Sequence, residues 1–237
     1  MEYDMLIVGA GLYGSTCAHE LTKKGFRCLI IEKRDHIGGN CFTEQRDGIQ
    51  IHKYGPHIFH TSNKRIWTWV KQFADFNHYR HTVRINAGNQ IYSLPLNLMT
   101  FHQLWGVKTP TEAIAHLEKV KLDHQDFKTL EGWILSKVGT EIYEKFFKEY
   151  SRKQWGQCPS QLPSSIIKRL PIRFSFNDNY FDDTYQGIPI GGYTAMFEEM
   201  LTGIEVRLNV DYFENRHFFD SLAAKVLYTG PKDRFFD

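Results

Sequence analysis

The sequence predicts an α/β fold that opens with a βαβ unit. Two short apolar runs, residues 5–8 and 28–31, are typical of buried strands. Between them, residues 15–24 form an amphipathic segment that predicts a helix, and Gly25 ends it. Strands that alternate with helices in this way build a parallel sheet.

The turn between the first strand and the helix has the pattern G-x-G-x-x-G, formed by Gly9, Gly11 and Gly14. Gly9 permits a tight turn, Gly11 lets the backbone approach a pyrophosphate, and Gly14 allows the helix to pack close to the strand. Glu32 ends the second strand, 18 positions after Gly14, where it can accept hydrogen bonds from a ribose 2′-hydroxyl; this argues against NADP. These features predict a dinucleotide site; an ordinary turn without a ligand is the alternative.

A second glycine pair, Gly38 and Gly39, follows the acidic residue. It brings further backbone N–H groups near the phosphates, which an NAD site does not usually need. The segment resembles the D/E-x(4–5)-GG signature of FAD enzymes of the glutathione-reductase type, in which the adenosine lies near the acidic residue. The alternative is that the pair is only a flexible turn.

The remaining elements follow from local patterns. Residues 63–76 predict a helix, and the alternation of residues 81–86 and 90–94 around Gly88-Asn89 predicts a β-hairpin. Residues 100–151 are expected to be helical, with Thr109-Pro110 as a start signal and Gly139 as a break between residues 130–138 and 141–150. Further along the chain we expect a short helix at 164–170, a helix at 194–201, and strands at 206–208 and 225–228.

The composition is that of a globular protein with a sizeable core. The chain has 237 residues, of which 42% are hydrophobic and 15% aromatic, and its net charge of +2 does not indicate a nucleic-acid partner. The four cysteines show no CxxC pattern, and His52, His57 and His60 lack the spacing of zinc ligands, so we expect no metal site. With no basic leader and no apolar run near the ~20 residues of a membrane span, we expect a cytoplasmic protein without membrane insertion.

A third motif, HKYGPHIFHT at residues 52–61, makes the resemblance to a single family more specific. With GAGLYG, EKRDHIGGN, YSLPLNL, KQWG, LPSSIIKRLPIRF, DNYF and QGIPIGGYT, in this order, the chain resembles the bacterial UDP-galactopyranose mutases. The resemblance implies an FAD-binding Rossmann-like fold of the glutathione-reductase type with an inserted helical domain and antiparallel sheet, incomplete at the C-terminus. It implies an FAD domain at 1–76 and 189–237, sheet parts at 77–102 and 171–188, and a helical substrate domain at 103–170.

The family interconverts UDP-galactopyranose and UDP-galactofuranose, which supplies galactofuranose for cell-surface polysaccharide. The resemblance implies that FAD must be reduced and that its N5 atom is the nucleophile on the anomeric carbon, so that no protein nucleophile is expected. The cofactor-binding positions that match are Gly9, Gly11, Tyr13, Gly14, Glu32, Lys33, Gly39, Asn40, His57 and Ile58. The UDP-sugar positions that match are His81, Phe146, Tyr150, Ser151, Trp155, Arg169 and Tyr180.

Two residues are expected to be catalytic by this resemblance. His60 would lie beside the flavin near N5, and Arg169 would bind a phosphate from a mobile loop. The alternatives are that His57 and His60 brace a loop and that Arg169 forms a surface salt bridge. Phe146 and Tyr150 have i, i+4 spacing and could line one side of a uridine slot, although such a pair taken alone is more often part of a core.

Two departures from the family pattern affect these expectations. His81 stands where we expect an asparagine, and it either weakens one uridine-side contact or replaces the asparagine as a donor. Family members also run well beyond residue 237, through a second diphosphate-binding arginine, two active-site tyrosines and a Gly-rich part of the FAD site. We therefore expect the chain alone to be a poor mutase, with a homodimer or a complementing C-terminal chain as possible partners.

Two other functions stay open. The chain could be a non-catalytic fragment that binds a UDP-sugar or depends on a partner. It could also be a flavin oxidase of the same fold, although the KQWG and KRLPIRF motifs suit a nucleotide-sugar pocket better than an amine channel.

Overall fold

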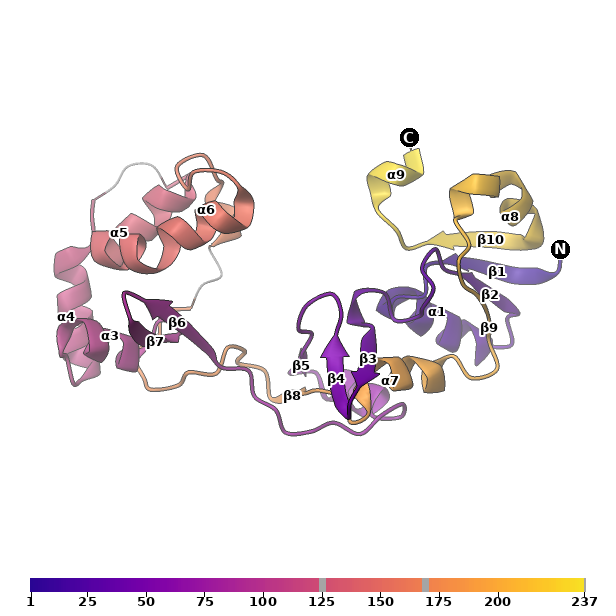
Figure 1. Ribbon diagram of the computed structural model, residues 1–237, viewed down its shortest axis with the longest axis horizontal. Helices are drawn as coiled ribbons and strands as arrows, with labels where there is room; N and C mark the ends of the chain where they lie inside the picture. Colours follow the sequence, from indigo (N-terminus) through magenta and orange to yellow (C-terminus); the bar gives the residue numbers. More distant parts are fainter. Residues whose placement is uncertain (124–126, 168–170, 237) are drawn as a thin grey trace. The chain divides into compact units, whose positions relative to one another are not determined.

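The computed structural model describes residues 1–123, 127–167 and 171–236, and the chain divides into two compact units. The first unit comprises Met1–Tyr79 and Asp183–Asp237, and the second comprises Arg80–Asp182 (Figure 1).

The first unit is built on a parallel sheet of four strands in the order β10-β1-β2-β9. β1 (Tyr3–Val8) pairs with β2 (Cys28–Ile31) on one side and with β10 (Ala223–Tyr228) on the other, and β9 (Glu205–Arg207) extends the sheet beyond β2. α1 (Leu12–Thr22) connects β1 to β2, which confirms the predicted βαβ unit. Because all four strands are parallel, the loops that follow them meet at one edge of the sheet.

The other elements of this unit surround the sheet or form small antiparallel pairs, β3 with β4 and β5 with β8. They are β3 (Thr43–Arg46), β4 (Ile49–His52), β5 (Phe59–Thr61), α2 (Lys64–Val70), β8 (Tyr185–Gly187), α7 (Gly192–Met200), α8 (Arg216–Leu222) and α9 (Lys232–Phe236).

Alternate side chains of the parallel sheet fill two separate cores. Leu6 and Leu29 pack on one face with Phe219 of α8, whereas Ile7 packs on the other face with Ala18 of α1. Figure 1 shows α8 and α1 on opposite sides of the sheet. Both faces are therefore covered, which explains why the β1 and β2 sequences are continuously apolar rather than alternating.

Several predicted boundaries in the described residues differ from the structure, including those of three predicted helices. α1 begins at Leu12 rather than at residue 15, because the extended Gly11 is its N-cap. α2 ends at Val70 rather than at residue 76, and the chain after it is held by backbone hydrogen bonds between residues 75–77 and 188–190. The helix predicted at 164–170 is a 3₁₀ turn at Ser164–Ile166, and residues 168–170 lie outside the described residues.

The second unit contains the predicted hairpin and a group of helices. β6 (Val83–Ala87) and β7 (Gln90–Leu94) form the antiparallel pair, which confirms the prediction from Gly88-Asn89. Gly139 has φ 76° and ψ 179° and interrupts the helical stretch, as its position in the sequence predicted. The helices are α3 (Leu98–Trp105), α4 (Pro110–Val120), α5 (Leu130–Ile142), a π-helical segment (Tyr143–Lys148) and α6 (Glu149–Trp155).

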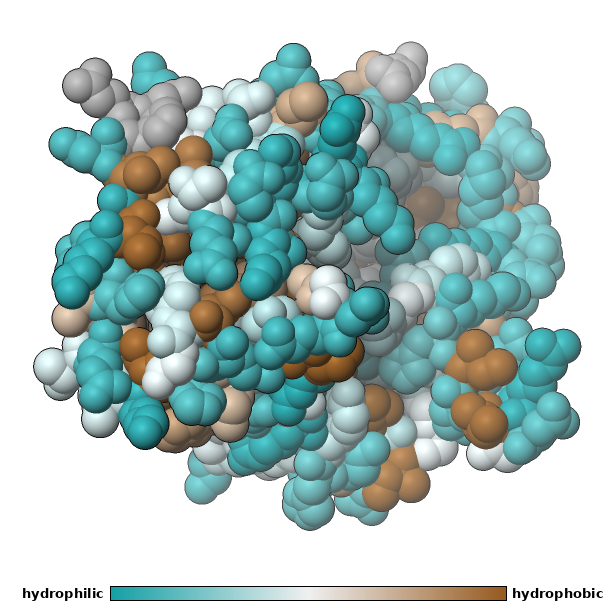
Figure 2. All heavy atoms as spheres, turned by 60° about the vertical axis from the view of Figure 1, so that its left-hand side comes forward, coloured by the Kyte–Doolittle hydropathy of each residue, from teal (hydrophilic) through white to brown (hydrophobic). Residues whose placement is uncertain are grey.

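None of the helices in the described part of the chain is long and apolar enough to cross a membrane. Several large hydrophobic side chains are exposed, including Ile49 and Ile190 in the first unit. On the face drawn in Figure 2, hydrophobic residues lie among hydrophilic ones.

Candidate functional site

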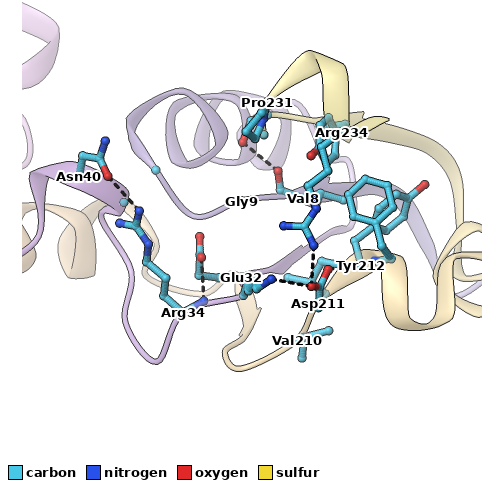
Figure 3. Close-up of a pocket in the computed structure, with 18 residues that line it drawn as sticks. Val8, Gly9, Glu32, Arg34, Asn40, Val210, Asp211, Tyr212, Pro231 and Arg234 are labelled. Carbon is cyan, nitrogen blue, oxygen red and sulfur yellow. Dashed lines mark hydrogen bonds and ion pairs between the residues drawn. The ribbon is translucent and has the colours of Figure 1, made fainter. Parts of the chain in front are cut away.

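A cavity of about 560 Å³ lies at the carboxyl edge of the parallel sheet (Figure 3). Each strand is followed by residues that line the cavity: Gly9, Glu32 and Thr229 come directly after β1, β2 and β10, and Asp211 lies four residues after the end of β9. Ligands of open α/β sheets bind in the crevice at this edge. The cavity is therefore the candidate dinucleotide site, and all of its lining belongs to the first unit.

The glycines shape the wall of the cavity nearest α1. Gly9 has φ +108°, and its N–H donates to the carbonyl of Ile31 at 2.8 Å. A Cβ on Gly14 would overlap the carbonyl oxygen of Gly9, and one on Gly39 would lie only 3.0 Å from the Cα of Gly11. No side chain caps the N-terminus of α1, so the N–H groups of its first turn stay available for an anion.

Glu32 lies between this glycine turn and the segment after β9. Its Oε2 accepts a hydrogen bond from the N–H of Ala10 at 2.8 Å, and its Oε1 accepts one from the N–H of Arg34 at 2.9 Å. Its own carbonyl accepts from the N–H of Val210 at 2.9 Å. The carboxylate is buried and fixed, yet each oxygen keeps a lone pair with which it can accept a further hydrogen bond from a ribose hydroxyl.

A charged group, which we call the Asp211 cluster, consists of Lys33, Asp211 and Arg234. Oδ2 of Asp211 lies 2.8 Å from Nζ of Lys33 and 3.0 Å from Nη2 of Arg234. The hydrogen bond from Lys33 is the main cause that holds the pKa of Asp211 below its usual value. Oδ1 accepts from the N–H of Phe213, whose ring centroid lies 5.2 Å from the guanidinium carbon of Arg234.

The second glycine loop is held by Arg34. Its Nη2 donates to Oδ1 of Asn40 at 3.0 Å, and its guanidinium lies over the ring of Tyr54, 4.3 Å from the centroid. His36 also contacts Tyr54, with 2.7 Å between Nε2 and the hydroxyl oxygen. These contacts fix the position of the loop that brings Gly39 to the cavity.

The structure brings together part of the predicted cofactor set. The predicted residues that line the cavity are Gly9, Gly11, Glu32, Lys33, Gly39 and Asn40. Tyr13, Gly14, His57 and Ile58 are outside its lining. Tyr13 is exposed on the first turn of α1, and Gly14 is the close contact between that helix and the glycine turn.

His60 has a partner that the sequence did not indicate. Its Nδ1 lies 2.6 Å from Oδ2 of Asp183, and the hydroxyl of Ser62 donates to Oδ1 of the same carboxylate at 2.7 Å. The hydrogen bond from His60 is the largest cause that lowers the pKa of Asp183. Nδ1 of His57 lies 2.9 Å from the carbonyl oxygen of Gly55, which is the kind of contact that braces a loop.

The predicted UDP-sugar residues lie in the second unit, and the structure brings His81 and Tyr180 together. The N–H of Tyr180 donates to the carbonyl of His81 at 2.7 Å, and their rings meet edge to face with centroids 5.3 Å apart. Arg169 lies outside the described residues.

Other members of this set differ in exposure. Phe146 is buried against Tyr92, with ring centroids 4.9 Å apart, whereas Tyr150 is 64% exposed. Phe146 therefore fits the alternative of a core residue, and the uridine slot stays a prediction. Ser151 is buried, and Trp155, the last residue of α6, is half exposed.

Sequence reasoning missed Asp211, Arg234 and Thr229 as cavity residues. The predicted strands at 206–208 and 225–228 were the available signal, because residues that follow parallel strands gather at one edge of the sheet. The pairing of Asp211 with Lys33 and Arg234 has no local motif that could have indicated it.

The chain is similar to known proteins over most of its length. Residues 145–237 match the family described as UDP-galactopyranose mutase, and residues 7–73 match the NAD(P)-binding Rossmann-like domain. A probable UDP-galactopyranose mutase of Klebsiella pneumoniae is 41% identical over 98% of this chain and 62% of its own length. Over almost its whole length, the chain is similar to a UDP-galactopyranose mutase. The resemblance inferred from the motifs is thereby confirmed.

Two further proteins show how much of the length of known mutases this chain covers. The dTDP-fucopyranose mutase of Escherichia coli is 40% identical over 98% of this chain and 64% of its own length. A crystal structure of reduced UDP-galactopyranose mutase superposes with a TM-score of 0.65 at 14% identity, over 87% of this chain and 48% of that chain. The structural match confirms the predicted α/β fold, and the chain spans a little under two thirds of the length of these mutase relatives.

Proposed function

We propose that the chain is the FAD-binding and substrate-binding part of a nucleotide-sugar mutase that interconverts UDP-galactopyranose and UDP-galactofuranose. The observation that carries this proposal is the cavity at the carboxyl edge of the sheet, where a glycine turn and a buried, hydrogen-bonded Glu32 lie side by side. It occurs in a chain that is related to mutases over 98% of its length.

The cavity residues fit the adenosine diphosphate part of FAD. Gly11 and Gly39 bring two backbone segments so close that a side chain on Gly39 would fill the gap between them. The uncapped N-terminus of α1 suits the negatively charged diphosphate, and Glu32 suits a ribose hydroxyl. Reduced FAD, when bound, supplies a nucleophile, its N5 atom, for the anomeric carbon of the sugar.

The protein's own residues would bind the cofactor and the nucleotide sugar and orient them. In the first unit, His60 is held by Asp183, and this would fix its ring where it meets the cofactor. In the second unit, the exposed rings of Tyr150, Trp155 and Tyr180 can stack on a base or a sugar. The buried members of the predicted substrate set, Phe146 and Ser151, would instead support that surface, while His81 and Arg169 stay proposed contacts.

A second candidate is the same type of reaction on dTDP-fucopyranose, because the Escherichia coli relative is about as similar as the Klebsiella pneumoniae one. A flavin oxidase is less well supported, because the KQWG and KRLPIRF motifs lie in the region that matches the mutase family. The proposal includes three further points. The reaction would supply sugar for cell-surface polysaccharide, and the protein would be cytoplasmic. Its partner would be either a second copy of the chain in a homodimer or a complementing chain.

The test is the visible absorption spectrum of the purified chain incubated with FAD and freed of excess cofactor, before and after dithionite. We expect a flavin band that bleaches on reduction. Turnover by the reduced protein is then compared on UDP-galactofuranose and dTDP-fucofuranose, and we expect low activity on the UDP-sugar. A colourless protein would contradict FAD binding, and turnover of the dTDP-sugar alone would favour the second candidate.

A further inference from the structure

The Asp211 cluster joins two walls of the cavity that come from distant parts of the sequence. Figure 3 shows Arg234 reaching from the segment after β10 to Asp211, in the segment after β9. Lys33, directly after Glu32, meets the same carboxylate oxygen. All three residues of the cluster line the cavity.

The strand order indicates which part of a dinucleotide would lie there. The glycine turn follows β1, Glu32 follows β2, and Asp211 follows β9, and these three strands are consecutive neighbours in the sheet. A nucleotide with its diphosphate at the glycine turn and its ribose at Glu32 has its base on the far side of the ribose. On that side of the ribose, the cavity is lined by residues 210–213 and by Arg234.

We propose that Arg234 is a base-recognition residue whose planar guanidinium, oriented by Asp211, stacks on the face of the adenine. This inference rests on the proposed binding of FAD. Guanidinium planes stack on aromatic rings and on nucleobases, and Arg234 already lies over the ring of Phe213. Its side chain is 46% exposed, whereas Asp211 is only 14% exposed, so the carboxylate is the fixed partner and the guanidinium has an open face.

A structural role for Arg234 is the alternative, since it lies on α9 and its ion pair also fastens that helix. Arg216 provides the matched control. It fastens the same helix through Phe235, with its guanidinium carbon 4.4 Å from the ring centroid and its Nη1 donating to the carbonyl at 3.4 Å. Arg216 does not line the cavity.

The experiment is calorimetric titration of the full chain with ADP, and with inorganic pyrophosphate as a probe that has no base. Arg234→Met should weaken ADP binding roughly tenfold, which is within the range for loss of one stacked base, and change pyrophosphate binding less than about twofold. Arg234→Lys should stay weak, because it keeps the charge and loses the plane. Arg216→Met should bind both probes like the parent protein.

The outcomes separate this inference from the proposed function. Equal weakening of ADP and pyrophosphate, or full rescue by lysine, would show attraction to phosphate and overturn base stacking. Weakening by Arg216→Met as strong as that by Arg234→Met would show that Arg234 only fastens α9. Unchanged ADP affinity in Arg234→Met would overturn the inference and leave the proposed function intact, whereas a parent protein that binds neither ADP nor FAD would overturn both.

Discussion

At the scale of single residues, carboxylates organise the first unit by accepting hydrogen bonds from partners that are distant in the sequence. Glu32 connects the glycine turn to the loop after β2, and Asp211 connects that loop to α9. Asp183 connects β8 to β5 by accepting from His60 and Ser62. Hydrogen bonds to a charged acceptor are stronger than neutral ones, so each carboxylate holds its neighbours in one arrangement.

Asp183→Asn should make the free energy of unfolding less dependent on pH in acid. The hydrogen bond from His60 holds the pKa of Asp183 below its usual value of 3.8. A pKa that is lower in the folded state gives stability that is present above the unfolded pKa and is lost as the pH falls through the folded pKa. Urea denaturation from pH 7 to pH 3 measures this, and the parent protein should lose more stability below about pH 5 than the variant.

Ser62→Ala is the companion variant, because it removes the second donor and leaves His60 in place. It should give a pH dependence between those of the parent protein and Asp183→Asn. If Asp183→Asn and the parent protein lose stability in parallel, the carboxylate does not carry the effect.

At the scale of elements, the sequence predicted those helices and strands that are determined by residues close to them in the sequence. The βαβ unit is such a case, because apolar runs, glycines and Glu32 all act within 32 residues. The β3–β4 hairpin was missed although Asp47-Gly48 is a typical hairpin pair, and both residues have positive φ. The end of α2 could not be predicted, because bonds to residues 188–190 determine it.

Gly14→Ala tests the contact between α1 and the glycine turn. A Cβ there would overlap the carbonyl oxygen of Gly9 and lie 3.2 Å from the side chain of Ile7, so the backbone must move. Because the overlap is with backbone, overpacking should cost about 2–3 kcal/mol, and the better helix propensity of alanine returns about 1 kcal/mol. We expect a net loss of about 1–2 kcal/mol in the free energy of unfolding, measured by urea denaturation.

Thr16→Ala, on the same helix, serves as the control for Gly14→Ala. It improves helix propensity without adding an atom, so it should not lower the free energy of unfolding. A Gly14→Ala protein as stable as the parent would mean that the turn adapts to a side chain and that glycine is not needed for packing.

At the scale of the whole molecule, the cavity is assembled from four strands that lie at both ends of the chain. The sequence predicted Gly9 and Glu32, because they belong to a local motif. It did not predict Asp211 or Arg234, because their meeting depends on the strand order and on the path of the chain after β10. The predicted substrate residues came from family resemblance, which cannot tell a buried ring such as Phe146 from an exposed one.

Since every residue that lines the cavity belongs to the first unit, a nucleotide should stabilise that unit selectively. A ligand at 100 times its Kd stabilises the unit that binds it by about 2.7 kcal/mol. With ADP at that concentration, hydrogen exchange measured by mass spectrometry should slow in β1, β2, β9 and β10, and stay unchanged in the β6–β7 hairpin and in α5. Equal slowing in α5 would mean that the two units open together, so that binding energy from the first unit also reaches the helices of the second.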